Sequence, residues 1–374
     1  MKIGIDARLL SLPVTGIGRY THEMCRQLVM LEGQYCLYTP APPMQDDWQQ
    51  THVSVRHAAC SSRVSRMLWS QTLLPLWAAQ DKVDLFWGTS HRLPRFLPAA
   101  TARVVTIHDM VWKIAGETMR PLSRFMEGAL MPQAIHMADR VIADSLSTAE
   151  AIESAYPAAR GKVRVVYLGA TILPAPAAFS SLACFEIDRP YFLFVGTLEP
   201  RKNLKRLVEA YAGLDEEVRN QTLLVIAGGK GWGAVDLAAL VEKLGVTRHV
   251  RLTGYVSESE LATLYAHARF LAMPSVYEGF GLPLVEAMSL GVPVLTSNVS
   301  SLPEVAGDAA VLVDPLVTAS IAHGLSSLLT DQQLHDRLAG LACANAARFS
   351  WQKAAGELHG IFVEACNERK KRKR

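Results

Sequence analysis

The sequence lacks the patterns that mark several large classes of protein. Its six cysteines are scattered, with no CxxC pair and no spacing typical of metal ligands, which predicts reduced thiols rather than a disulfide scaffold, and no catalytic cysteine. The N-terminus MKIGIDARLL turns polar too early for a signal peptide. We therefore expect a cytoplasmic protein.

Four motifs of catalytic and phosphate-binding sites are also missing. The chain contains no DxD, HExxH, GxxxxGK[ST] or GxSxG pattern. Metal-clamped phosphate chemistry, P-loop hydrolysis and serine hydrolysis therefore lack their usual parts. We predict a site without metal or cofactor, in which side chains and backbone would have to neutralise any bound diphosphate.

Excess positive charge is confined to the end of the chain. The net charge is +3, and because the last six residues (369–374) are all basic, the rest of the chain carries about −3. This balance argues against a nucleic-acid-binding protein. Two interpretations of Arg369–Arg374 stay open: a solvated, disordered end, or attraction to anionic lipid, worth about 1 kcal/mol per cation near the surface.

The chain is long enough for two α/β domains. Short apolar runs alternate with longer helical stretches, and an Ala-, Pro- and Ser-rich segment (170–190) interrupts the pattern before it restarts. Such alternation predicts two Rossmann-like, doubly wound parallel-sheet domains facing a cleft, at residues 1–172 and 190–349, followed by a helix at 350–367 and a basic tail at 368–374. Ligands of such sheets bind beyond the carboxyl ends of the strands.

The stretch SVYEGFGLPLVEAMSLGVP places two glutamates around a glycine loop. After the predicted strand RFLAMPS, Glu278 falls on the loop, and Glu286 falls in the first turn of a helix that starts near Pro283 and stops near Gly291. The free amides of such a helix start favour anions or oxygen-rich ligands. Glu286 alone would only complement the helix dipole, but the pair with its loop glycines predicts a binding site.

Two cations follow the strand YFLFV in the segment GTLEPRKN. Arg201 and Lys202 are expected at or just before a helix start, where the dipole disfavours positive charge and only Glu199 compensates locally. This placement predicts a phosphate-bearing ligand. The alternative is a solvated pair on a surface helix.

Two further candidates lie in the first half of the chain. Gly16 and Gly18 form a GxG loop after the first strand, but Thr21 stands where a dinucleotide fingerprint needs a third glycine, and the second strand, YCLYTP, ends without an acidic residue. His108 ends the strand RVVTIHD beside Asp109 and is a candidate site residue, with a structural, hydrogen-bonding histidine as the alternative. The preceding strand ends in WGTSHRLP, which we expect to line the same wall of the cleft.

The chain resembles the retaining GT-B glycosyltransferases of the largest nucleotide-sugar-dependent family. Six segments carry the resemblance in the family's order: GIGRYT, IHD, GTLEPRKN, AGGKGW, LTGYVSESELATLY and EGFGLPLVEAM. MLWSQTLLP and VDLFWGTSHRLP further resemble bacterial mannosyltransferases that build O-antigen and related polysaccharides. One departure is Thr197, which stands where many relatives have an arginine, so the diphosphate site would depend more on Arg201 and Lys202.

The resemblance implies a role for each matching residue. Glu286 would bind the ribose hydroxyls, Glu278 and the following amides would hold the donor sugar, and His108 would contact that sugar near the reacting carbon. The implied catalytic set is His108, Arg201, Lys202 and Glu278, and the implied donor-binding set is Gly16, Gly18, Arg201, Lys202, Tyr255, Val256, Glu278, Gly279, Phe280, Gly281, Leu282 and Glu286.

The implied reaction moves a sugar, α-mannose from GDP-mannose, onto a lipid-linked glycan acceptor with retention of configuration and without metal. The leaving diphosphate would take the acceptor proton, the last helix would cross back onto the first domain, and the basic end would attach the enzyme to the inner face of the cytoplasmic membrane. Two alternatives stay open: a catalytically silent scaffold that binds sugar nucleotides, and a nucleotide-sugar epimerase or phosphorylase on the same fold.

Overall fold

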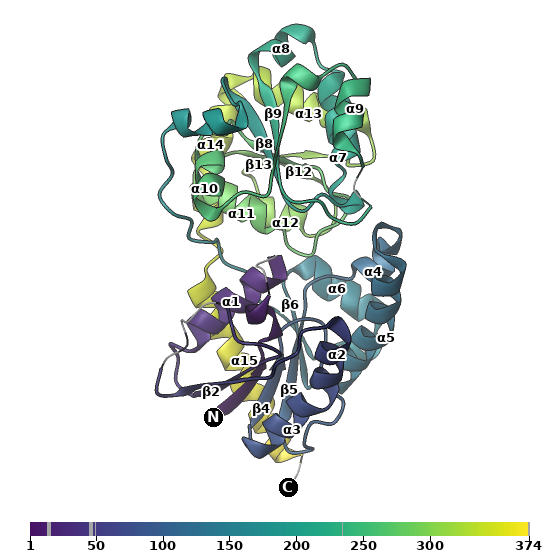
Figure 1. Ribbon diagram of the computed structural model, residues 1–374, viewed down its shortest axis with the longest axis vertical. Helices are drawn as coiled ribbons and strands as arrows, with labels where there is room; N and C mark the ends of the chain where they lie inside the picture. Colours follow the sequence, from purple (N-terminus) through teal and green to yellow (C-terminus); the bar gives the residue numbers. More distant parts are fainter. Residues whose placement is uncertain (13–15, 45–47, 49, 234, 373–374) are drawn as a thin grey trace. The chain divides into compact units, whose positions relative to one another are not determined.

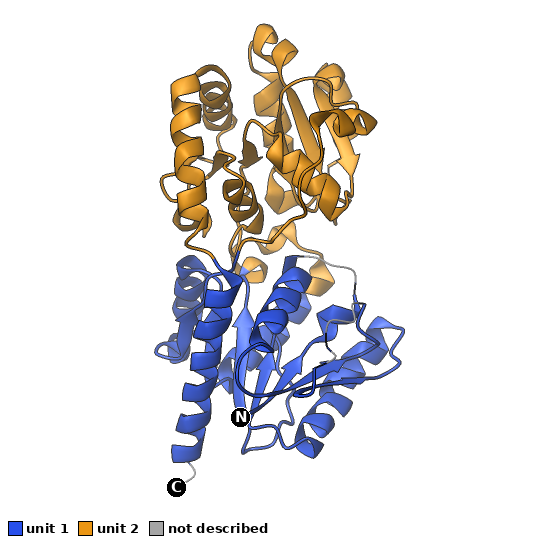
Figure 2. Cartoon of the chain, turned by 90° about the vertical axis from the view of Figure 1, so that its left-hand side faces the viewer, with its two compact units in different colours: residues 1–110, 125–169, 350–374 blue, residues 111–124, 170–349 orange. Residues whose placement is uncertain are grey.

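The computed structural model describes residues 1–12, 16–44, 48, 50–233 and 235–372 (Figure 1). The chain divides into two compact units, one made of residues 1–110, 125–169 and 350–374 and the other of residues 111–124 and 170–349 (Figure 2). The division differs from the predicted one at residues 111–124, which belong to the second unit. There Val111 and Ala115 pack against Tyr277 in a small buried cluster.

Unit 1 is built on a parallel sheet in the order β3-β2-β1-β4-β5-β6-β7. Its described strands are β1 (Lys2–Asp6), β2 (Gln34–Thr39), β3 (Val53–His57), β4 (Leu85–Gly88), β5 (Ala102–Ile107), β6 (Arg140–Ala143) and β7 (Val163–Val165). The central strands are buried almost throughout, as expected for a parallel sheet covered on both faces. β3 was not among the predicted strands, because this edge strand is only half-buried and lacks a continuous apolar run.

Helices cover both faces of this sheet (Figure 1). They are α1 (Gly16–Leu28), α2 (Arg63–Gln71), α3 (Leu73–Gln80), α5 (Pro121–Met137), α6 (Leu146–Ala155) and α15 (Trp351–Lys371), with short 3-10 turns at Arg8–Ser11 and Pro157–Ala159; the neighbouring α4 (Val111–Ile114) and the turn Gly116–Thr118 belong to unit 2.

The last helix, α15, folds with unit 1 although unit 2 precedes it in the chain (Figure 2). The Phe362 ring lies 5.7 Å from that of Trp87, and the Trp351 ring lies 6.2 Å from that of Tyr20. The helix continues to Lys371, past the predicted end at 367.

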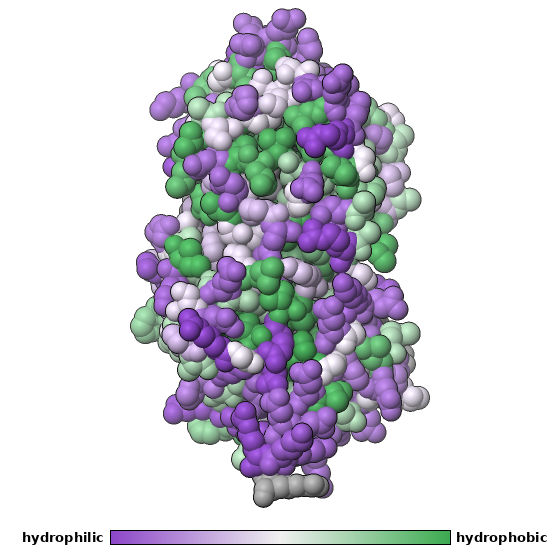
Figure 3. Space-filling model, turned by 180° about the vertical axis from the view of Figure 1, so that it is seen from behind, coloured by the Kyte–Doolittle hydropathy of each residue, from purple (hydrophilic) through white to green (hydrophobic). Residues whose placement is uncertain are grey.

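The predicted separate tail at 368–374 is therefore wrong as far as Lys371, and residues 373–374 lie outside the described residues. Cations in a last turn are favoured by the helix dipole. Arg369 is also held by unit 1, because its guanidinium lies 3.0 Å from the Asp139 carboxylate and donates to the Ala99 carbonyl. Hydrophilic residues gather beside this end of the chain (Figure 3).

Unit 2 contains a second parallel sheet, in the order β10-β9-β8-β11-β12-β13. Its described strands are β8 (Tyr191–Val195), β9 (Leu223–Ala227), β10 (Val250–Gly254), β11 (Leu271–Met273), β12 (Val294–Ser297) and β13 (Ala310–Val313). All six coincide with predicted runs. The prediction of two doubly wound α/β domains is confirmed.

The helices of unit 2 also lie on both faces of its sheet (Figure 1). They are α7 (Leu204–Ala212), α8 (Glu216–Gln221), α9 (Leu237–Lys243), α10 (Glu258–Ala266), α11 (Leu282–Ser289), α12 (Leu302–Ala306), α13 (Thr318–Thr330) and α14 (Gln332–Ala346), with 3-10 turns at Phe179–Phe185, Pro200–Lys202 and Thr247–His249. Ser257 caps α10 in a capping box with Glu260, as the sequence predicts. The cleft expected between the two domains stays a prediction.

Candidate active site

Three predicted site residues meet in one buried cluster of unit 2. Glu278 is buried on the loop after β11, and its carboxylate lies 2.6 Å from Lys202 Nζ and 2.5 Å from Arg201 Nη1. Both cations follow β8, which is the neighbour of β11 in the sheet. Glu199, the expected local partner, accepts from Arg201 at 3.1 Å, but Glu278, which is distant in the sequence, pairs with both cations.

The charges of this cluster depend on one another. Burial by itself raises the pKa of Glu278, but Arg201 and Lys202 outweigh it and lower the pKa to about 2. Burial lowers the pKa of Lys202, while Glu278 opposes that change. Because an ammonium has three donors and a guanidinium five, both cations can hold Glu278 and still donate to a further anion.

Backbone geometry fixes the two cations in place. Arg201 and Lys202 lie in the 3-10 turn before α7, as predicted, and Asn203 ends that turn with a φ of 61°. The side-chain amide of Asn203 donates through Nδ2 to the carbonyls of Pro274 and Pro315 at 2.9 and 2.7 Å. The contact with Pro274 ties the turn to the segment that leads to Glu278. Sequence reasoning missed Asn203, although asparagine is one of the few residues that adopt this left-handed conformation readily.

Two serines hold the loop that carries Glu278. Ser301 Oγ donates to the carbonyls of Glu278 and Phe280, each at 3.0 Å, and the Glu278 amide donates to Ser300 Oγ at 3.1 Å. The loop is therefore anchored by β12–α12 as well as by its own glycines. These serines were not predicted, and only their position after the strand PVLTSN could have indicated them.

The predicted loop residues Gly279, Phe280 and Gly281 lead directly into α11. Gly281 caps the helix with a φ of 104°, a conformation that favours glycine, and Leu282 is the first helical residue. The Phe280 side chain is buried, with its ring 5.5 Å from that of Phe349. Backbone rather than side chain is therefore what this loop can offer a ligand.

The second glutamate of the pair lies deeper in the helix than predicted. Because α11 starts at Leu282, Glu286 belongs to its second turn, not its first, and the helix ends at Ser289 with Gly291 following at a φ of 74°. Glu286 is buried and accepts from the Tyr265 hydroxyl at 3.0 Å. This position weakens the alternative in which Glu286 only complements the dipole, since that effect is confined to the first turn.

The other predicted donor contacts lie at the edge of the same sheet. Tyr255 and Val256 follow β10, and the Tyr255 side chain is 79% exposed.

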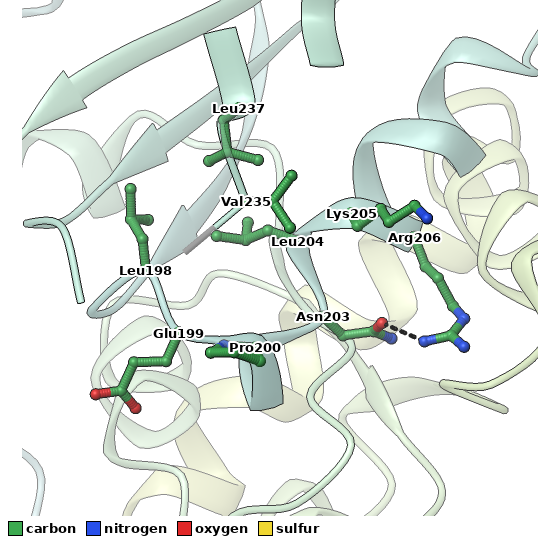
Figure 4. A pocket seen from close by; sticks show the side chains of 9 residues that line it. All are labelled: Leu198, Glu199, Pro200, Asn203, Leu204, Lys205, Arg206, Val235 and Leu237. Carbon is green, nitrogen blue, oxygen red and sulfur yellow. Dashed lines mark hydrogen bonds between the residues drawn. The ribbon is translucent and has the colours of Figure 1, made fainter. Parts of the chain in front are cut away.

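A pocket of about 190 Å³ borders the turn before α7 (Figure 4). Glu199, Pro200 and Asn203 line both the pocket and the turn. Arg206 also lines the pocket and donates to the Asn203 side chain at 3.0 Å.

His108 sits at the carboxyl end of β5 in unit 1, with both ring nitrogens engaged. Nδ1 lies 2.6 Å from the Asp144 carboxylate and Nε2 lies 2.8 Å from the Thr89 carbonyl. Two acceptors require two ring protons, so the ring is held as an imidazolium. Burial lowers the pKa of His108, but Asp144 outweighs burial and the net shift is upward. Inside unit 1, His108 therefore makes the contacts expected of a structural, hydrogen-bonding histidine.

A second histidine supports the first. The His108 amide donates to His91 Nε2 at 3.0 Å, which leaves the proton of the neutral His91 ring on Nδ1, 3.4 Å from the Glu127 carboxylate. Burial raises the pKa of Glu127, yet His91 and Arg92 lower it to about 2. The segment WGTSHRLP, which contains Thr89 and His91, was expected to lie beside His108, but the individual contacts and the partner Asp144 were not predicted. The indication for Asp144 was that it follows β6, which flanks β5.

Two expectations for unit 1 need correction. Gly16 and Gly18 lie in the first turn of α1 and not in an open loop, and the residues before them (13–15) lie outside the described residues. Trp87 does not line a wall: it is buried in the core of unit 1 and donates to Thr106 Oγ1 at 3.0 Å.

The arrangement in unit 2 can bind a multiply charged anion next to a polar ligand. It combines two fixed cations, a buried carboxylate and a helix start at the carboxyl ends of neighbouring parallel strands, the usual ligand position of such sheets. Within the described ranges, no three His, Cys, Asp or Glu side chains gather as metal ligands would.

Comparisons with known proteins agree with this geometry. Residues 185–342 match the family described as glycosyl transferases group 1, and residues 14–172 match Glycosyltransferase Family 4. The chain is 34% identical over 373 residues to O-antigen chain mannosyltransferase B of Escherichia coli, a match that covers 94% of this chain and 97% of that protein.

Solved structures show the same fold. Sucrose-phosphate synthase from Thermosynechococcus elongatus is similar with a TM-score of 0.78 at 21% identity, over 97% of this chain and 98% of that one. HepE of Anabaena, solved in complex with UDP and glucose, is similar with a TM-score of 0.72 at 19% identity, over 97% of this chain and all of that one. With its two-sheet GT-B fold and a full-length relative, the chain belongs to the group 1 glycosyltransferases.

Proposed function

We propose that this chain transfers a mannosyl residue from GDP-mannose to a lipid-linked glycan acceptor, with retention of configuration, in the synthesis of a bacterial surface polysaccharide. The full-length relative named as an O-antigen chain mannosyltransferase supports the sugar and the pathway class. The single observation that carries the chemistry is the Arg201–Lys202–Glu278 cluster.

In this proposal the cluster receives the donor diphosphate. Arg201 and Lys202 supply fixed positive charge where negative charge develops on the leaving group, so no divalent ion and no cofactor is required. Because Glu278 already holds both cations in position, little reorganisation is needed when the donor binds. Glu278 also accepts from hydroxyls of the donor sugar, and the amides of the loop that leads into α11 donate to the oxygens of that sugar.

The nucleoside is bound by the remaining predicted residues of unit 2. Glu286, oriented by the Tyr265 hydroxyl, accepts from the ribose hydroxyls, and the base lies near the exposed loop at Tyr255 and Val256. His108 is a fixed positive charge that contacts the donor sugar near the reacting carbon. No residue of the cluster acts as a covalent nucleophile, and the leaving diphosphate takes the proton of the acceptor hydroxyl.

A transfer assay tests the reaction. The purified chain is incubated with GDP-mannose, UDP-glucose or UDP-galactose and a synthetic mannose-terminated acceptor, and NMR determines the anomeric configuration of the product. We expect transfer from GDP-mannose to give an α-linkage. A β-linked product would contradict retention, faster transfer from a UDP-sugar would contradict the donor, and tight donor binding without transfer to any acceptor would favour the silent scaffold.

Lys202→Ala tests the role of the cluster. Loss of one preorganised donor to the developing charge is expected to lower kcat about 100- to 1000-fold, measured in the same assay. The matched control is Lys205→Ala, three positions on, because Lys205 is exposed and pairs only weakly with Glu209 at 3.8 Å. Near-native turnover of Lys202→Ala, or an equal loss in Lys205→Ala, would show that the diphosphate binds elsewhere.

The proposed location is the inner face of the cytoplasmic membrane. Across the described ranges, no helix combines the length and the apolarity that crossing a bilayer would need. The basic end of the chain supports a peripheral attachment, through Lys370 and Lys371 more than through Arg369, which is held by Asp139.

A further inference from the structure

The outer faces of α2 and α3 carry apolar side chains where a surface helix normally carries polar ones. On α2, Val64 and Leu68 are 67% and 58% exposed, and Met67 between them is about half exposed, while Trp69 on the other face is buried. These positions are spaced by three and four residues, so their side chains form one stripe. The helix thus presents an apolar face to the outside.

Two neighbouring segments extend this stripe into one surface. Thr72 alone separates α2 from α3 (Figure 1), and α3 adds the exposed side chains of Leu73 and Leu76. The Arg95 amide donates to Gln71 Oε1 at 3.1 Å, which brings Phe96, itself 71% exposed, to the end of α2. We call this surface the α2–α3 face; it consists of Val64, Met67, Leu68, Leu73, Leu76 and Phe96, with Arg63, Arg66 and Arg95.

The segments that form this face carry charge of one sign. No Asp or Glu occurs from residue 48 to residue 80, or from residue 85 to residue 108. The arginines come from both segments, and the Arg95 guanidinium lies 6.0 Å from the centre of the Phe96 ring. An apolar face bordered by arginines without carboxylates is complementary to a surface that is apolar inside and negatively charged at its border.

We propose that the α2–α3 face binds an anionic lipid bilayer, with its aliphatic side chains among the acyl chains and its arginines at the headgroups. A second copy of the chain fits this face less well, because a two-fold contact would bring the same arginines together without a carboxylate between them. The benefit of this binding rests on the proposed function, since the contact would place unit 1 beside a lipid-linked acceptor. The binding of the α2–α3 face to a bilayer does not depend on that function.

Vesicle binding of the full chain tests the proposal. Cosedimentation is measured with vesicles of phosphatidylethanolamine and phosphatidylglycerol and with vesicles of phosphatidylcholine alone. We expect the wild-type chain to bind the anionic vesicles. Leu68→Glu combined with Leu76→Glu should weaken that binding about tenfold or more, because two exposed aliphatic side chains that would enter the bilayer are replaced by charges that the anionic surface repels. Arg63→Gln with Arg66→Gln is expected to weaken it as well, with a smaller dependence on salt.

Matched controls separate this face from other surfaces. Leu316→Glu with Leu341→Glu places the same charges on exposed leucines of unit 2 and is expected to bind as the wild type does. Lys370→Gln with Lys371→Gln tests the basic end. The proposal is overturned if the Leu68 and Leu76 variant binds as the wild type does, if only the Lys370 and Lys371 variant loses binding, or if neutral vesicles are bound equally well.

Two further measurements complete the test. If mass photometry without vesicles shows a dimer that the Leu68 and Leu76 variant abolishes, the occupant is a second copy and the proposal fails. Transfer to a water-soluble acceptor is expected to be unchanged in the same variant, with an unchanged melting temperature. If the wild-type chain transfers no sugar, the proposed function is contradicted, but the result of the vesicle experiment still stands.

Discussion

At the scale of single residues, each unit contains predicted site charges that are held before any ligand arrives. Lys202 and Arg201 share one buried carboxylate in unit 2, and in unit 1 the imidazolium of His108 lies between Asp144 and Thr89. Such pairs add little net stability, but removing one partner is costly because it leaves a buried charge alone.

The His108–Asp144 pair gives a prediction about pH. Burial alone would lower the pKa of His108, but Asp144 raises it above its ordinary value of 6.5 in the folded state. The pair therefore stabilises the fold fully below that ordinary value, and its contribution is lost as the pH rises through the raised pKa of His108. Asp144→Asn is therefore expected to lower the free energy of unfolding by about 3 kcal/mol near pH 6, and by only about 1 kcal/mol near pH 10, where a neutral hydrogen bond remains.

Urea unfolding at several pH values measures this difference. NMR titration of labelled histidine adds a direct readout, since the pKa of His108 should fall in the variant. A cost that does not change with pH would show that Asp144 holds a neutral ring.

At the scale of elements, the loop from Glu278 to Leu282 depends on its backbone conformation. A Cβ on Gly281 would lie 3.0 Å from Leu302 Cδ2, at a φ of 104° that side chains rarely adopt. Gly281→Ala is therefore expected to destabilise the protein by about 1 to 3 kcal/mol and to lower transfer, because Glu278 moves with the loop.

Gly340→Ala is the matched control. Gly340 lies within α14, and a Cβ there meets nothing within 4 Å, so the same substitution should stabilise the helix by about 0.5 to 1 kcal/mol. Thermal unfolding and the transfer assay measure both variants. Equal shifts of the melting temperature would contradict the role assigned to the backbone of Gly281.

At the scale of the whole molecule, unit 1 is completed by the last helix. Phe362 is fully buried against Trp87, while its neighbour Val363 is exposed. Phe362→Ala is expected to destabilise unit 1 by about 3 to 5 kcal/mol, and Val363→Ala by less than about 0.5 kcal/mol. Hydrogen exchange should rise in β4 and β5 of the first variant and stay unchanged in β8 and β9. An equal rise in both sheets would contradict the division into units.

Much of this architecture could be predicted from the sequence, because strands of covered parallel sheets are continuous apolar runs. β3 was not predicted, because an edge strand needs no continuous apolar run. The positions of Lys202 and Glu278 were predictable from the loops that follow β8 and β11, but their pairing was not, because 76 residues separate them and only the order of strands in the sheet brings them together. The two ring partners of His108 escaped for the same reason.

The division of unit 1 also affects how the protein is made. A ribosome synthesises residues 1–169 long before residues 350–374, so the hydrophobic side of the first sheet that α15 covers stays open while the whole of unit 2 emerges and folds. Nascent chains arrested before the last helix should therefore recruit chaperones. Premature termination before α15 would give a product that aggregates rather than a shortened, active enzyme.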